Sequence, residues 1–376
     1  MKLVRRNLLR RPLRSVLTVA GVACAIALFV LVESLSAGLD RALSGSEAAR
    51  TLIVYRQNRY CPQTSFLPQN DAERIAKIDG VASVLPVKVF LSNCRANLDV
   101  VAFHGVPAGE VFAARKLELI EGDRAEFERR GDGALLGESF AKRRGKKVGD
   151  TFRWGSIEVH VSGIFRSPEP IEESLIVTHL DHLQRAGPVD KLGTVTEFEV
   201  KVADPARAKA IAAEIDALLA TSEAPTDTRA KLAFLEGATG DLREILRFGR
   251  IFGLACVAVV LVLIGNTGAM AVRERVRELA VLRTLGFRDA RLVRMVMTES
   301  LLLTLAGSLL GIVAALATIR VSQLTIGVEG VLVTFTTSAE LLTRALIVAS
   351  AAAIAAALAP ALTAVRVAIP TALRGA

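Results

Sequence analysis

The stretch 273-RERVRELAVLRTLGFRDARLVR-294 contains seven arginines in 22 residues. It lies between two long runs without a charged residue, 251–272 and 300–319. A helical run of about 20 apolar residues is roughly 30 Å long, which matches the hydrocarbon thickness of a bilayer. The cationic stretch is therefore predicted to be a loop between two membrane-spanning helices.

Two further uncharged windows, 15–32 and 345–365, have the same character. The whole chain is 52% hydrophobic with a mean hydropathy of +0.42, which is more apolar than a soluble domain of 376 residues usually is. One such window could be a buried core helix, but four windows bounded by charge predict an α-helical membrane protein with four transmembrane helices.

The positions of the basic residues predict the topology. Residues 1–14 carry six cations and no acid, and the 273–298 loop and the tail from residue 366 are also basic, whereas 37–248 holds 29 Lys and Arg against 31 Asp and Glu. Basic loops stay in the cytoplasm. A nucleic-acid-binding protein would instead gather its basic residues on one folded face, so no nucleic-acid partner is expected.

The predicted organisation alternates between the two sides of a membrane, with both termini cytoplasmic. The expected segments are a basic tail 1–14, a first span 15–36, an extracytoplasmic α+β domain with a stalk 37–248, a second span 249–272, a cytoplasmic loop 273–298, a third span 299–319, a short outer loop 320–344, a fourth span 345–365 and a tail 366–376.

The first window also resembles a secretory signal. It exceeds the usual apolar core of about 7–15 residues, and it lacks an A-x-A cleavage site. Gly21-Val22-Ala23-Cys24 imitates a lipoprotein cleavage site only loosely. We therefore expect the first span to be retained.

The inserted segment 37–248 has a globular composition. Residues 51–55 and 84–91 predict strands, with a helix over 70–79 that ends at Gly80. Residues 150–163 alternate about Gly155 and predict a hairpin with one buried face. Residues 197–219 predict a strand followed by a helix capped by Asp204, with Ile211, Ile215 and Leu218 on its buried side.

The sequence gives little sign of catalysis. His179 and His182 lie near acidic residues, but they lack a third ligand at zinc spacing and are interpreted as ordinary surface histidines. There is no nucleotide-binding G-x-x-x-x-G-K-[ST] motif and no G-x-S-x-G or H-E-x-x-H motif. We expect a non-catalytic chain with no metal and no cofactor of its own.

Several polar and thiol side chains leave alternatives open. Cys61 and Cys94 both fall in the inserted domain, where they form a disulfide or remain two buried thiols. Glu33 and Glu299 stand at the edges of spans, which favours carboxylates that reach the interface over a transport role.

The arginine-rich loop has two interpretations. Its residues 273–285 favour a short helix with an apolar stripe and pairs of opposite charge, ended by Gly286. The arginines either enforce topology and contact lipid headgroups, or form a docking element for a protein.

In the third span, Gly307 and Gly311 predict a close helix contact within the chain or with a second copy.

The region 273-RERVRELAVLRTLGFRDARLVRMVMTESLLLTLAGSLLGIVAALA-317 resembles the signature region of the MacB/FtsX-like permeases, the membrane subunits of four-span ABC transporters. The resemblance extends to NLLRRPLRSVLTVAGV, ALLGESFAKRRGKKVGDTF, EVKVADPARAKAIAAEID and RVAIPTALRG, so it covers nearly the whole chain. The compact inserted domain with its cysteine pair is the main departure.

The resemblance implies that the cytoplasmic helix couples this chain to a separate ATPase subunit, which binds the ATP and Mg²⁺. The coupling residues it implies are Arg273, Arg277, Glu278, Leu279, Leu282, Arg283, Leu285 and Gly286. It further implies a second permease copy, contact with membrane lipids and, in some relatives, a periplasmic adaptor protein. Expected functions are export or extraction of a hydrophobic or peptide-like substrate by force transmission, or alternatively activation of an extracytoplasmic cell-wall enzyme.

Overall fold

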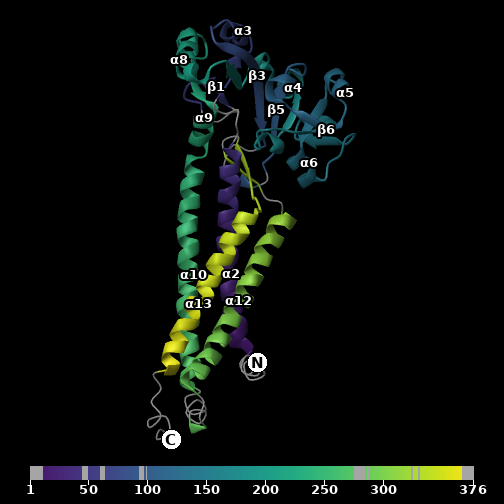
Figure 1. Cartoon of the computed structure of the whole chain (residues 1–376). Helices are drawn as coiled ribbons and strands as arrows, with labels where there is room; N and C mark the ends of the chain where they lie inside the picture. The colour runs from purple at the N-terminus through teal and green to yellow at the C-terminus, as the bar shows by residue number, and fades with distance from the viewer. Residues whose placement is uncertain are drawn as a thin grey trace. The chain divides into compact units, whose positions relative to one another are not determined.

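A computed structural model describes residues 12–44, 50–59, 64–92, 97–98, 100–274, 284–285, 288–322, 325–328 and 331–365. The chain divides into two compact units (Figure 1). The membrane unit comprises Met1–Ala37, Ile245–Ser322 and Phe335–Ala376. The second unit, here called the inserted domain, comprises Gly38–Glu244 and Gln323–Thr334.

Long apolar helices form the membrane unit. Each contains one of the four windows found in the sequence, and each has a stretch long and apolar enough to cross a bilayer. The helices are α2 (Pro12–Ala42), α10 (Gly240–Glu274), α12 (Asp289–Ser322) and α13 (Ala339–Val365). Their shared core includes Val22, Ile26, Phe29, Val257, Ile264, Ile312, Ala345, Ala352 and Ala356. The predicted fold class, four transmembrane helices with an α+β domain between the first two, is confirmed.

Two glycines of α12 lie directly against α2. A Cβ atom built on Gly307 would stand 2.8 Å from the Val19 carbonyl oxygen, and one on Gly311 would stand 2.5 Å from the Ala23 carbonyl oxygen. Both distances are shorter than a carbon atom tolerates, so only glycine permits this approach of the two backbones. The contact expected from the Gly-x-x-x-Gly spacing is therefore made within the chain.

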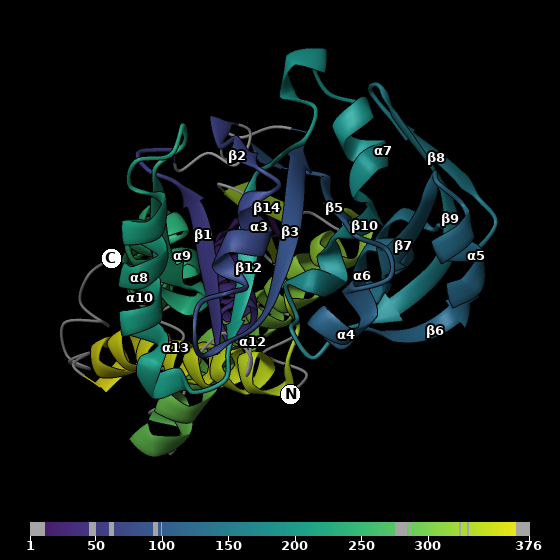
Figure 2. The ribbon, with the colours of Figure 1, turned by 90° about the horizontal axis from the view of Figure 1, so that it is seen from above.

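The inserted domain is built on one long sheet, whose strands follow the order β13-β1-β12-β3-β5-β10-β7-β9-β6, with β8 paired to β9. Figure 2 shows these strands running from β1 on one side of the domain to β6 on the other. Most neighbours are antiparallel, but β5–β10 and β7–β9 are parallel. The strands are β1 (Thr51–Arg56), β2 (Leu67–Pro68), β3 (Val81–Leu91), β4 (Asn97–Leu98), β5 (Ala102–Val106), β6 (Glu118–Gly122), β7 (Gly133–Gly137), β8 (Thr151–Trp154), β9 (Ile157–Arg166), β10 (Ile176–His179), β11 (Thr194–Val195), β12 (Glu197–Val202) and β13 (Thr226–Ala230).

Short helices pack on the sheet and form the hydrophobic cores of the domain with it. The α-helices are α3 (Asp71–Ile75), α4 (Val111–Arg115), α5 (Arg124–Arg129), α6 (Glu138–Arg144), α7 (Leu180–Arg185), α8 (Ala208–Leu219) and α9 (Lys231–Ala238), and the 3-10 helices are η2 (Glu172–Ser174), η3 (Val189–Lys191) and η4 (Pro205–Arg207). One face of β1 and β12 packs on α3 and α8, with Val54, Phe198, Ile75 and Ile215 buried between them. The opposite face of β12 carries Glu197 and Glu199.

The local predictions for this domain are largely confirmed. The hairpin around Gly155 is β8–β9, and Gly155 has the positive φ of 59° that the turn requires. Asp204 caps the following helical segment by accepting a hydrogen bond from the Ala206 amide at 2.9 Å. The prediction for Leu218 is wrong, because it is 37% exposed and the adjacent Leu219 is buried in its place. The predicted helix over 70–79 is shorter than expected and spans Asp71–Ile75.

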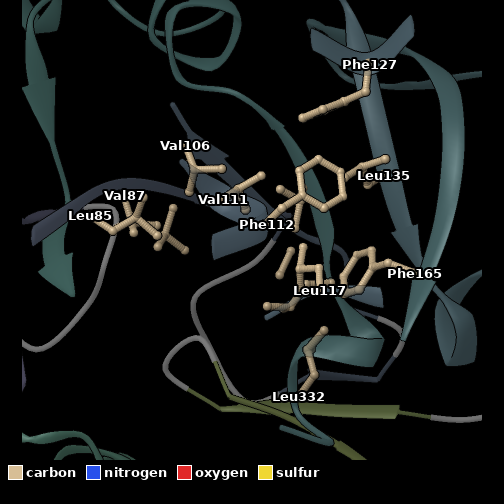
Figure 3. Packing of buried hydrophobic residues seen from close by; sticks show 14 of the residues in the cluster. Leu85, Val87, Val106, Val111, Phe112, Leu117, Phe127, Leu135, Phe165 and Leu332 are labelled. Atoms are coloured by element: carbon tan, nitrogen blue, oxygen red, sulfur yellow. The ribbon is translucent and has the colours of Figure 1, made fainter. Parts of the chain in front are cut away.

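The segment after the third span is more than a loop. It forms a hairpin of β14 (Thr325–Val328) and β15 (Val331–Thr334), and β14 also pairs with β4. Figure 3 shows Leu332 of β15 beside Leu117 in the core that also holds Phe112, Phe127 and Phe165. The chain therefore returns to complete the inserted domain between its third and fourth membrane helices.

The helix contact at Gly311 gives a direct test. Replacement of Gly311 by alanine should destabilise the membrane unit by about 1–3 kcal/mol, because the added methyl group meets a backbone oxygen that cannot rotate away. Gly21→Ala on α2 is the matched control, since nothing described lies within 4 Å of its Cβ position. Thermal unfolding of the purified variants in detergent measures the difference, and equal melting temperatures would contradict the packing.

Candidate functional site

The predicted coupling residues are only partly within the described chain. Arg273 lies in the last turn of α10 and is exposed, and Leu285 is 70% exposed. The other predicted coupling residues lie outside the described residues: Arg277, Glu278, Leu279, Leu282, Arg283 and Gly286. Their role in docking an ATPase therefore stays a prediction from the sequence.

A charged cluster joins three helices of the membrane unit at one end of their apolar stretches. Glu33 of α2 is only 8% exposed and forms an ion pair with Arg250 of α10. Its second oxygen lies 3.8 Å from Arg344 of α13, which also bonds Glu340 at 2.6 Å. The position of Glu33 at the edge of a span predicts a carboxylate that reaches the interface, and this stays a prediction. The structure adds that its carboxylate connects helices that are more than 200 residues apart in the sequence.

The inserted domain contains a buried ionic centre. Arg115, at the end of α4, places its guanidinium on Glu199 of β12 with two hydrogen bonds of 3.2 and 2.9 Å. Its Nε also lies 3.8 Å from Glu172, which is 3.4 Å from Lys231 of α9. All four residues are less than 10% exposed. Charges this deep in a protein are stable only when each has a partner, and here each does.

The electrostatics of this centre agree with its geometry. Burial alone would raise the pKa of Glu199, but Arg115, Lys231 and His104 together outweigh burial and hold that pKa below its usual value. Burial, reinforced by the neighbouring Arg115, lowers the pKa of His104 to about 3. The ring is therefore neutral at pH 7, and its Nδ1 accepts a hydrogen bond of 3.0 Å from Arg115.

Glu197 is the exception in this centre. It lies two residues before Glu199 on the same face of β12 and is 7% exposed, yet none of the described residues donates a hydrogen bond to its carboxylate. Burial, together with the nearby charge of Glu199, raises its pKa to about 7. Both glutamates line a cavity of about 60 Å³ that also contacts Phe234 and Lys231.

The other candidate ligands and thiols give no site in the described chain. His179 and His182 each bond a backbone carbonyl through Nε2, at 2.7 Å to Phe127 and 2.8 Å to Glu158. No group of three His, Cys, Asp or Glu placed to hold a metal occurs among the described residues. Cys61 and Cys94 lie outside the described residues, so their disulfide stays a prediction.

Sequence reasoning missed the buried ionic centre. The run 197-EFEVKV-202 alternates charged and apolar residues, which is typical of a strand with one face in solvent. The structure covers that charged face with α4, α9 and η2, so the glutamates are buried. A cation more than 80 residues away in sequence, Arg115, satisfies Glu199, and no local pattern reveals that pairing.

Two family models match this chain, and parts of it are similar to solved structures at low sequence identity. A family model for the MacB-like periplasmic core domain matches residues 15–218, and one for the FtsX-like permease C-terminal region matches residues 250–369. The periplasmic region of MacB from Actinobacillus actinomycetemcomitans is 13% identical with a TM-score of 0.37, over 52% of this chain and 96% of that one. The extracellular domain of the ABC-type transporter YknZ from Gram-positive bacteria is 14% identical with a TM-score of 0.35, over 48% and 98%. A domain of a putative permease from Porphyromonas gingivalis is 14% identical with a TM-score of 0.31, over 50% and 90%.

Removal of Arg115 tests the ionic centre. Arg115→Met should destabilise the inserted domain by about 3–5 kcal/mol, because Glu199 is left buried without its partner. Arg124→Met removes an exposed pair with Glu128 and should cost less than about 1 kcal/mol. Urea unfolding followed by the fluorescence of Trp154, the chain's single tryptophan, reports on this domain. Similar losses in the two variants would contradict a stabilising role for the buried pair.

Glu197 predicts a specific pH dependence. Unfolded, its carboxyl group ionises near its ordinary pKa of 4.5, whereas folded it keeps its proton until about pH 7. The folded state thus binds more protons between these values, so this group lowers stability as pH rises from about 5 to 7, by about 3 kcal/mol. Glu197→Gln should remove that slope, matching the wild type at pH 5 and exceeding it at pH 8. Parallel urea midpoints of the two proteins across this range would disprove it.

Proposed function

This chain belongs to the MacB/FtsX-like permeases, the membrane subunits of ABC transporters, and from that premise we propose that it couples ATP hydrolysis by a separate cytoplasmic ATPase to motion of its inserted domain. It is a multi-pass membrane protein of a family of non-catalytic subunits that work with an ABC ATPase. In this proposal ATP and Mg²⁺ bind to the ATPase, both termini are cytoplasmic, and two permease copies act together in the bacterial inner membrane.

The continuity of α10 is the observation that supports this coupling best. The helix runs without a break for 35 residues, from Gly240 to Glu274. At ~1.5 Å per residue it is roughly 52 Å long, well beyond a hydrocarbon layer of about 30 Å. Its first residues belong to the inserted domain, and its last turn carries Arg273, the first predicted coupling residue. A displacement at one end is thereby carried along a single hydrogen-bonded rod.

The charged cluster around Glu33 would make α2 and α13 move together with α10. Ion pairs connect α10 to α2 through Arg250 and Glu33, and α13 joins through Arg344. The backbone amide of Thr336 also donates to the Ser34 carbonyl at 3.3 Å, and the Ser34 hydroxyl donates to the Thr336 carbonyl at 2.8 Å. Helices fixed to one another at this level would move as a group rather than singly.

The predicted docking element is the amphipathic cationic segment 273–286. Its apolar stripe would enter a groove of the ATPase, and its charged residues would pair around the rim. Opening and closing of the ATPase subunits would then push and pull this segment. The resulting motion of the inserted domain would export or extract a hydrophobic or peptide-like substrate.

Substitutions in the docking segment test the proposal. Glu278→Lys and Leu282→Asp should each reduce stimulation of the co-purified ATPase at least tenfold, because one reverses a rim charge and the other places a carboxylate in the apolar stripe. Both residues lie outside the described chain, so the test depends on the sequence pattern. The measurement is ATPase activity of the complex reconstituted in lipid.

The control for this test is Glu223→Lys, the same charge reversal at an exposed position of the inserted domain. It should leave stimulation unchanged. Full stimulation in both docking variants, with normal membrane insertion, would refute the coupling role of the segment. Failure of any ATPase to co-purify with the wild-type chain would remove the premise that this chain has a partner of that kind.

A further inference from the structure

A small cavity lies beneath α9 in the inserted domain. Its volume is about 60 Å³, and it is partly open to solvent. Apolar side chains make most of its wall, including Ile53 of β1, Val89 of β3 and Leu235 of α9. One side of the cavity is formed by the ionic centre of Arg115, described above. The cavity therefore has an apolar wall and a charged floor.

The charges of that floor are not balanced. Arg115 and Lys231 supply two buried cations, which Glu199 and Glu172 already neutralise. His104 contributes no charge at neutral pH, since its ring accepts a hydrogen bond from Arg115. Glu169, also buried, lies near enough to Lys231 to raise the pKa of that amine. Ionised Glu197 is therefore an additional carboxylate, and the described residues around it supply no further cation beyond Arg115 and Lys231.

Two polar groups at this end of the cavity have unused hydrogen-bonding capacity. The carboxylate of Glu197 receives no hydrogen bond from the described residues although it is more than nine-tenths buried. The Nη1 of Arg115 is likewise buried without an acceptor in the described part of the chain. Buried polar groups are normally satisfied, so two unmet groups beside one cavity indicate that something else occupies it.

The cavity wall favours a cation over a neutral occupant. Phe234 presents an aromatic ring to the cavity and is itself held by Tyr55, whose ring centroid lies 5.1 Å away. Aromatic faces attract ammonium groups, particularly where water is excluded. An anion would instead add to the negative charge of Glu197, because Arg115 and Lys231 are already paired with Glu199 and Glu172.

We propose that this cavity binds a primary ammonium group carried on a short aliphatic chain, with Glu197 as its counter-ion and Phe234 and the aliphatic residues around its hydrocarbon part. The volume admits only a few heavy atoms, so the ligand is a small amine or the end of a lysine side chain. An oxygen acceptor on the same ligand, or a water bound with it, would satisfy Arg115.

This binding site does not depend on the proposed coupling to an ATPase. It nevertheless has a mechanical consequence, because Lys231, Phe234 and Leu235 all belong to α9, which directly precedes α10 in the sequence. An occupied cavity would hold α9 against the sheet through contacts on both sides of the ligand. The inserted domain would thus sense an amine at the helix that leads into the membrane.

The test uses the full-length chain in lipid nanodiscs and ligand-observed NMR saturation transfer. Butylammonium should bind, whereas butanol and butyrate, which have similar size but lack the positive charge, should bind at least tenfold more weakly. Affinity should be about tenfold higher at pH 8 than at pH 6, because the ionised fraction of Glu197 rises from about one tenth to about nine tenths around a pKa of about 7. The groups that set this dependence face Glu197 from α4, β5, β12, η2 and α9: Arg115, His104, Glu199, Glu172 and Lys231.

Variants separate the site from nonspecific binding. Glu197→Gln keeps the shape of the side chain and should lose at least tenfold in affinity together with the pH dependence, and Glu223→Gln on the surface should change neither. A blocked tripeptide, acetyl-Gly-Lys-Gly-amide, distinguishes the two sources: binding of the peptide as well as butylammonium identifies a lysine side chain as a competent ligand, and binding of butylammonium alone identifies a free amine. Equal binding of butanol and butylammonium, or unchanged binding in Glu197→Gln, would overturn the proposal.

Discussion

A hydrocarbon layer offers no hydrogen-bonding partner to a peptide group, and this constraint determines the architecture. A chain that crosses such a layer must satisfy its backbone internally, which continuous helices do. The described spans are accordingly unbroken, and α10 and α12 continue well past the length that the bilayer requires. A helix costs little free energy to extend once it has formed. The helices that satisfy the backbone inside the hydrocarbon layer therefore also provide long rigid connections outside that layer.

Close packing of those helices cannot come from the hydrophobic effect, since lipid tails are as apolar as the side chains. Here α12 approaches α2 at Gly307 and Gly311, where the absence of a side chain permits contact with backbone carbonyl groups. At the end of the spans, Glu33 adds charged contacts with Arg250 and Arg344. Small residues therefore set the distance between helices within the apolar part. Ion pairs connect the helices at the ends of the spans, where charged groups cost less free energy.

The parts that could be predicted from sequence are those decided locally. Uncharged windows revealed the four spans because the bilayer imposes a length, and Asp204 and Gly155 revealed a cap and a turn because single residues decide them. The hairpin β14–β15 was missed because its strands are short and pair with a segment more than 200 residues away. The coupling residues were predicted by resemblance to a family, and their role stays a prediction.

The ionic centre of the inserted domain could not have been predicted in the same way, because burial there depends on which elements cover a strand. Glu197 and Glu199 alternate with apolar residues as solvent-facing positions do, and only the arrival of α4 and α9 turns their face inward. Sequence alternation specifies that a strand has two different faces. It does not specify that the polar face is the solvent face.

The energetic cost of this centre is itself informative. A buried ion pair is often no more stabilising than apolar residues of equal volume, and an additional unpaired carboxylate is distinctly unfavourable. Stability alone would therefore favour an apolar side chain at Glu197, which already lies among Ile53, Val89 and Leu175 around the same cavity. A ligand of opposite charge stabilises a domain that carries an unfavourable charge in its interior. That stabilisation would hold α9 in place. The charge imbalance that destabilises the domain is thus what would make it respond to such a ligand.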